Sequence, residues 1–157
     1  FKKYKTLRDY AKASPKEFEK DIRQTGFFRA KTKNILAAAR MVQKQYHGKV
    51  PRTMAEILKI PGVARKTANV VLGNAFGINV GVVVDTHVAR LSQRLGLTRA
   101  TTPERIERNL MKLVPQAQWA QFSHWLIWHG RRRCDARKPH CAGCELKVLC
   151  PQVGVKR

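Results

Sequence analysis

Apolar residues recur at spacings of three and four along most of the chain, which is the pattern of helices that bury one face. One such stripe contains Ile35, Leu36, Ala39 and Val42. Helices are predicted over residues 1–13, between Ser14 and Gly26, between Gly26 and Gly48, after Thr53, between Ala64 and Gly77, between Asp85 and Gly96, between Thr102 and Pro115, and over residues 116–129. No segment shows a convincing strand alternation; residues 80–84 are the only candidate, and a buried loop explains them. The predicted fold class is therefore all-α.

The first two predicted helices differ in how they begin. The first is predicted from its amphipathic pattern alone, which runs over residues 1–13 and places Tyr4 on the apolar side. We expect Ser14 to cap the next helix, with Pro15 at its first position and Glu17 completing a capping box.

A tight turn is predicted at Pro61-Gly62, because Pro fixes φ and Gly adopts conformations that other residues avoid. A helical pattern follows from Ala64 and stops at Gly77. Backbone amides of this hairpin are expected to stay free at the start of the helix. Such amides form an anion site that suits a DNA phosphate.

Two residues near the hairpin can do chemistry. Lys66 lies in the first helical turn, where the helix dipole opposes a charge on its amine and favours the neutral, nucleophilic form. The alternative interpretation is a phosphate-binding or solvated lysine. Asp85 follows the apolar residues 82–84 and precedes a predicted helix. The alternative there is an N-cap, a common role for Asp at that position.

The charge of the chain indicates a polyanionic partner. Its 157 residues include 32 Lys and Arg against 10 Asp and Glu, a formal net charge of +22 with a pI near 10.8. The excess runs along the whole chain, which nucleic acid explains best; an anionic membrane surface or simple solubility would be alternatives. No membrane span is predicted, because the most apolar run, residues 69–84, is short and contains Asn74 and Asn79.

All four cysteines lie close together near the carboxyl end. Cys134, Cys141, Cys144 and Cys150 have the spacing C-x6-C-x2-C-x5-C. So tight a group, without a secretory signal, favours a metal site over disulfides. Four thiolates satisfy either zinc or a 4Fe–4S cluster, and the spacing alone does not choose between them.

The stretch IPGVARKTANVVLGNAFG at residues 60–77, followed by VVVDTHV at residues 82–88, resembles the helix-hairpin-helix DNA glycosylase superfamily, most closely its endonuclease III family. The resemblance implies two helical lobes with the active site between them. Residues 1–79 would form the lobe with the hairpin, and residues 80–157 the lobe that ends in the cysteine loop. One departure is Ala64, where the family often has a second glycine.

By this resemblance Lys66 is the nucleophile and Asp85 its catalytic partner. The four cysteines would hold a 4Fe–4S cluster, with zinc as the less favoured alternative, and the cluster would shape a basic loop. The expected DNA-contacting residues are Pro61, Gly62, Val63, Ala64, Arg65, Lys31, Arg131 and Arg137.

The implied function is that of a bifunctional DNA glycosylase and abasic-site (AP) lyase of base excision repair, acting on oxidised pyrimidines. Its partner would be double-stranded DNA with damaged bases or abasic sites, and we expect a monomer in the cytoplasm, associated with the nucleoid in a bacterium. Two alternatives are a non-catalytic helix-hairpin-helix DNA-binding module and the adenine-specific mismatch glycosylases of the same superfamily. The latter lack the lysine found here at Lys66.

The beginning of the chain suggests a longer protein. It opens on Phe1 rather than Met, within an apparent helix, and the family's first helices have no counterpart here. We therefore expect further helices before Phe1.

Overall fold

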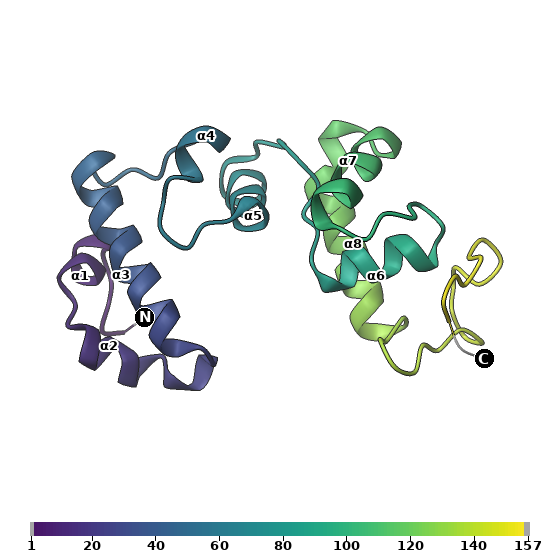
Figure 1. Ribbon diagram of the computed structural model, residues 1–157, viewed down its shortest axis with the longest axis horizontal. Coiled ribbons are helices and arrows are strands. Elements are labelled where there is room, and N and C mark those ends of the chain that lie inside the picture. Colours follow the sequence, from purple (N-terminus) through teal and green to yellow (C-terminus); the bar gives the residue numbers. More distant parts are fainter. Residues whose placement is uncertain (1, 156–157) are drawn as a thin grey trace. The chain divides into compact units, whose positions relative to one another are not determined.

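The computed structural model describes residues 2–155, and every regular element among them is helical (Figure 1). The helices are α1 (Leu7–Lys12), α2 (Pro15–Asp21), η1 (Arg23–Thr25), α3 (Phe28–Gln45), α4 (Met54–Ile57), α5 (Arg65–Phe76), α6 (Thr86–Arg94), α7 (Pro103–Leu113), η2 (Gln116–Gln118) and α8 (Trp119–Arg132). The all-α prediction is confirmed, and residues 80–84 form a loop.

The chain divides into two compact units between Ala68 and Asn69, within α5. The lobe boundary predicted at residue 79 stays a prediction.

In the first unit, α1 and α2 pack against α3. The stripe predicted on α3 is largely correct, since Leu36, Ala39 and Val42 are buried, whereas Ile35 is 38% exposed. These residues pack inward because they recur on one side of an 18-residue helix. The same unit also buries Phe18, Ile57 and Ile60.

Two predictions about the first helices were wrong. Helix α1 begins only at Leu7, so Tyr4 lies outside it, because Thr6 and Asp9 form a reciprocal capping box that fixes the start. Ser14 occupies the N-cap position of α2, but its side chain makes no capping hydrogen bond. Pro15 at the first position fixes φ near the helical value, so this helix begins without the predicted capping box.

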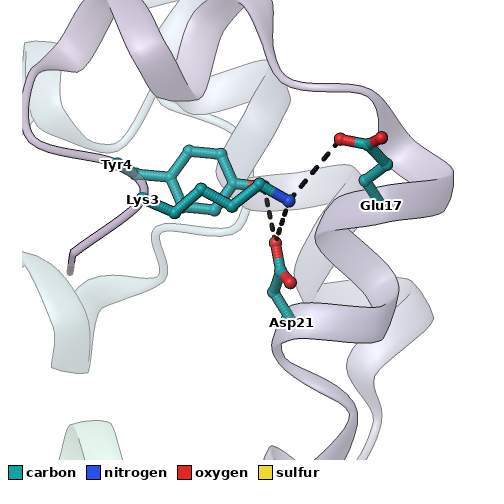
Figure 2. A network of polar contacts seen from close by, with 4 residues as sticks. All are labelled: Lys3, Tyr4, Glu17 and Asp21. Carbon is teal, nitrogen blue, oxygen red and sulfur yellow. Dashed lines mark hydrogen bonds and ion pairs between the residues drawn. The ribbon is translucent and has the colours of Figure 1, made fainter.

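The segment before α1 is held to α2 by a polar network (Figure 2). Lys3 Nζ and Tyr4 Oη both donate to Asp21 Oδ2, over 2.9 and 2.7 Å, and Lys3 also lies 3.5 Å from a carboxylate oxygen of Glu17. The Tyr4 ring contacts Phe18 edge-on, with ring centroids 5.1 Å apart. Tyr4 therefore joins the buried side of this unit although it precedes the helix.

The second unit is built around α6, which packs against α8 and α7. Its core consists of Val82, Val84, Val88, Leu91, Ile106, Leu110, Trp119 and Leu126. Val82 and Val84 join this core from a loop, and Val83 between them is also buried. Among the tryptophans of α8, Trp119 is buried in this core, whereas Trp125 and Trp128 are about half exposed.

None of the described helices combines the length and the apolar character needed to cross a membrane.

Candidate active site and cysteine cluster

The hairpin turn connects α4 to α5. Thr53 caps α4 by accepting from the amide of Glu56 over 3.3 Å. The turn closes when the amide of Val63 donates to the carbonyl of Ile60 over 3.1 Å, with Gly62 at φ 77°. Pro61 followed by a glycine with positive φ is the arrangement that this kind of turn requires. The expectation that all hairpin amides stay free is thus wrong for Val63, whose amide closes the turn.

Gly62 also has no room for a side chain. A Cβ at this position would lie 2.6 Å from Cβ of Asn34, an exposed residue of α3. The turn therefore packs directly on α3. In the part of the chain that the structure describes, no hydrogen bond uses the amides of Gly62 or Ala64. Both residues are exposed, so these amides can reach an anion.

Lys66 is the second residue of α5 and its side chain is exposed. The first helical turn contains no acidic residue. No described residue forms a hydrogen bond or ion pair with its amine. An amine in this position is open to a bound substrate, as a nucleophile must be.

Asp85 caps α6. Its Oδ1 accepts from the amides of His87 and Val88 over 2.8 and 2.9 Å, and the residue is half-buried. The loop before it is fixed by burial of Val83 and Val84 and by a bond from the amide of Val83 to Ser123 Oγ over 3.0 Å. Asp85 thus sits on a rigid support. The structure describes Asp85 in the second unit and Lys66 in the first.

The four cysteines come together at one cavity, whose lining also includes residues of α6 and α8. All four thiols are free and half-buried. These cysteines are Cys134, Cys141, Cys144 and Cys150. Four sulfur donors around one cavity are a donor set that fits an iron–sulfur cluster or a zinc ion.

Arg94 holds the start of the cysteine loop. Arg94 is 9% exposed, and its guanidinium donates to Cys134 Sγ over 3.2 Å, to the carbonyl of Asp135 over 2.7 Å and to that of Ala136 over 2.9 Å. On the other side, His129 Nε2 lies 3.4 Å from Cys144 Sγ. Nitrogen donors beside ligand sulfurs are the outer-shell contacts typical of metal centres.

A second arginine of α6 braces the same loop. Arg90 donates through Nη2 to the carbonyls of Gly130 and Cys134, over 3.1 and 2.9 Å, and lies 3.1 Å from His87 Nδ1. The helix that Asp85 caps is thus bonded directly to the loop that begins at Cys134.

The basic residues predicted to meet DNA have different surroundings. Arg131 and Arg137 are exposed. The amides of Arg137 and Lys138 donate to Asp135, which holds the pKa of that carboxyl below its usual value. The amine of Lys31 donates to the carbonyl of Thr25. Arg65 is exposed and Pro61 is half-buried.

One candidate that the sequence did not reveal is Phe27. Its side chain is 89% exposed, and its backbone at φ 47° lies in the left-handed region, just before α3. A non-glycine residue in that conformation is strained, and such strain is concentrated at functional sites. The signal available in the sequence was a second aromatic residue, beside Phe28, directly after Gly26.

These features define a helix-hairpin-helix protein with an exposed lysine after the hairpin and a cysteine-lined cavity. Residues 1–116 match the HhH-GPD superfamily of base excision DNA repair proteins. The chain belongs to that superfamily.

Among its relatives are two bacterial endonucleases III. That of Synechocystis sp. is 57% identical over 151 residues, which are 96% of this chain and 69% of the relative. That of Bacillus subtilis is 44% identical over 100% of this chain and 71% of its own length. The fold is similar to a trapped covalent intermediate of endonuclease III with DNA, at a TM-score of 0.91 and 43% identity, covering 97% of this chain and 71% of that one. The fold is also similar to that of a thermostable thymine-DNA glycosylase, with a TM-score of 0.79 and 31% identity, again covering 97% of this chain and 71% of the other.

Proposed function

We propose that this protein is a bifunctional DNA glycosylase and AP lyase of base excision repair. The observation that carries the proposal is Lys66, an exposed amine without a partner among the described residues, in the first turn after a hairpin. The similar structure of endonuclease III with DNA is a covalent intermediate, which requires a nucleophile on the protein. The proposed partner is double-stranded DNA that contains a damaged base or an abasic site, bound by a monomer.

In this mechanism the damaged nucleotide leaves the stack, because its C1′ is unreachable inside a duplex. The neutral amine of Lys66 attacks C1′, and the glycosidic electron pair departs with the base, which takes up a proton. Loss of a proton from the nitrogen and opening of the sugar ring give a Schiff base. Removal of a C2′ proton then expels the 3′ phosphate, which cuts the strand by β-elimination.

Asp85 is the proposed partner of this amine. Its carboxylate stabilises the positive charge that develops at the sugar and helps to move the proton that Lys66 loses. Its Oδ1 is occupied by the two capping bonds, so Oδ2 is the oxygen we assign to this role. The proposed substrates are oxidised pyrimidines, on the strength of the resemblance to endonuclease III.

The proposed cofactor is a 4Fe–4S cluster held by Cys134, Cys141, Cys144 and Cys150. The four free thiols around one cavity support this assignment. When bound, such a cluster would cross-link the loop through four iron–sulfur bonds, and it would leave no ligand position for the substrate. The chain's own residues then carry the reaction, while Arg94 and Arg90 orient the loop.

DNA contacts are proposed for two kinds of group. The amides of Gly62 and Ala64 suit a phosphate of the strand beside the lesion. Exposed cations at Lys31, Arg131 and Arg137 would add contacts that position the duplex without reading its sequence.

The test is borohydride trapping on a duplex that contains an abasic site. The unaltered protein should form a covalent adduct with DNA, and Lys66→Ala should form none while it still binds the duplex. Lys59→Ala is the matched control, because it removes an exposed lysine near the turn and should keep trapping. Binding by the unaltered protein without trapping or strand cleavage would instead indicate a non-catalytic DNA-binding module. An adduct that survives Lys66→Ala would refute the assignment of the nucleophile.

A further inference from the structure

A carboxylate that the proposed reaction does not use is buried in the second unit. Glu107 of α7 is 3% exposed, and its Oε1 accepts from Asn69 Nδ2 over 2.9 Å. Asn69 lies on α5 and is also 3% exposed. Acidic side chains are almost never buried to this extent unless a partner compensates the lost hydration. The bond between Glu107 and Asn69 joins two helices that are 38 residues apart in sequence.

The backbone of Gly81 packs against this pair. A Cβ at Gly81 would lie 1.9 Å from Glu107 Oε1 and 2.8 Å from Asn69 Nδ2. The two polar side chains therefore fill the space that any other residue at position 81 would need. This contact fixes the position of the loop that follows Gly81.

The pair is costly in one further respect. Asn69 Oδ1 is buried and has no hydrogen-bond partner among the described residues. An apolar pair of similar volume would fill the same space without leaving a buried acceptor unsatisfied. Packing alone therefore does not explain why polar residues occupy this position.

The location of the pair suggests what it does. Asn69 follows Lys66 by three residues, so the two side chains are neighbours on one side of α5. Gly81 precedes Asp85 by four residues, and the buried Val82, Val83 and Val84 connect them. The pair is thus one helical turn from the proposed nucleophile and one short, rigid loop from its proposed partner.

We propose that Glu107 is a positioning residue for the lyase reaction. Its carboxylate fixes Asn69, which sets the rotation of the first turns of α5, and it supports the loop from Gly81 to Asp85. Glu107 touches neither the substrate nor the reacting atoms, so it acts through Asn69 and Gly81. This inference rests on the roles of Lys66 and Asp85 under the proposed function.

Two substitutions at Glu107 test this role. Glu107→Ala removes the acceptor of Asn69, whereas Glu107→Gln keeps the shape and the acceptor oxygen and adds an N–H that can serve Asn69 Oδ1. We expect Glu107→Ala to slow single-turnover Schiff base formation by about 10- to 100-fold, the size of effect that a small misplacement of reacting groups produces. Affinity for the abasic duplex should stay unchanged, and Glu107→Gln should restore most of the rate.

Thr98→Val serves as the control for stability. Thr98 is a buried polar residue of the same unit, and its Oγ1 accepts from the amide of Ala100 and from Asn109 Nδ2. This variant should lower the Tm without changing the single-turnover rate of the folded protein. If Glu107→Ala does not fold, Asn69→Leu removes the same bond with a side chain of similar size and should show the same loss of rate.

The outcomes are distinguishable from failure of the proposed function. If the unaltered protein forms no Schiff base, the proposed function fails and the roles of its residues fail with it. If the unaltered protein reacts and the folded Glu107→Ala variant reacts equally fast, the positioning role is refuted. A Glu107→Gln variant as slow as Glu107→Ala also refutes it, because restored hydrogen bonding would then not restore the geometry.

Discussion

The carboxylate of Asp85 accepts the amide hydrogen of Val88 over 2.9 Å, and the same oxygen accepts from the amide of His87 over 2.8 Å. The interpretation of Asp85 as an N-cap is therefore confirmed. A cap does not exclude a catalytic role, because both capping bonds go to Oδ1. The cap instead gives the carboxylate one fixed orientation at the start of α6.

Asp85→Asn separates the two roles. The amide oxygen of Asn still accepts the capping bonds, so we expect a change in the free energy of unfolding of less than about 1 kcal/mol. The negative charge is lost, so turnover should fall by about 100-fold or more. Thermal unfolding and single-turnover cleavage measure the two effects separately. A destabilised variant with full activity per folded molecule would show that Asp85 acts only as the N-cap of α6 and has no catalytic role.

The second prediction concerns the metal. Protein purified without oxygen should be brown and contain about four iron and four sulfide per chain. Cys141→Ser should lower the iron content and loosen the loop, which limited proteolysis after Arg133 would detect. Lys66 and Asp85 lie outside this loop, so we expect DNA affinity to suffer more than the chemical step. A colourless, fully active protein with one zinc would contradict the cluster assignment.

The third prediction follows from the network at the beginning of the chain. Hydrogen bonds from Lys3 and Tyr4 hold the pKa of Asp21 below its usual value. A carboxyl whose pKa is lower in the folded state adds stability above its unfolded pKa of about 3.9, and this stability is lost as the pH falls through the folded pKa. Asp21→Asn should therefore lower the Tm at pH 7. The difference from the unaltered protein should shrink as the pH falls below about 4, and a constant difference would argue against the linkage.

Local signals were enough to predict most of the fold. Periodic apolar residues located the helices, and Pro61-Gly62 located the hairpin turn, because both depend on neighbouring residues only. The same reasoning failed at the start of the first helix, which the capping box of Thr6 with Asp9 fixes at Leu7, and at the cap of the second, where Ser14 makes no capping bond. The residues before Thr6 do not extend that helix, and their packing, with the ring of Tyr4 against Phe18, is a contact that a local pattern does not show.

Contacts between distant residues could not be predicted in this way. Nothing in the sequence indicates that Arg94 reaches Cys134, or that Glu107 reaches Asn69. These bonds join helices and loops whose distance depends on the whole core of the second unit. The cysteine spacing predicted a shared site, while the arginine beside it became visible only in the structure.

Phe27 provides a fourth prediction. An exposed aromatic ring on a DNA-binding protein can stack on a base or enter the duplex where a nucleotide has left it. Phe27→Ala should weaken binding to an abasic duplex by about 10-fold or more, because stacking on one base contributes roughly 1–3 kcal/mol. Folding should be unaffected, because the ring is exposed. Leu113→Ala, which shortens another exposed apolar side chain (58% exposed) outside the cysteine loop, is the control and should leave affinity unchanged.

The last prediction concerns Gly62 and its contact with Asn34. Gly62→Ala faces two penalties, since φ is 77° and the new Cβ would lie 2.6 Å from Cβ of Asn34. The conformation alone costs roughly 1–2 kcal/mol, and the clash adds to that cost because a Cβ cannot rotate away. Gly77→Ala is the matched control, since Gly77 has φ 68° and nothing within 4 Å of the position of a Cβ. Gly62→Ala should therefore destabilise the protein more than Gly77→Ala in chemical denaturation. It should also weaken DNA binding more strongly, because the displaced turn carries the amides of Gly62 and Ala64. Equal effects of the two substitutions would show that the turn does not depend on its close packing against α3.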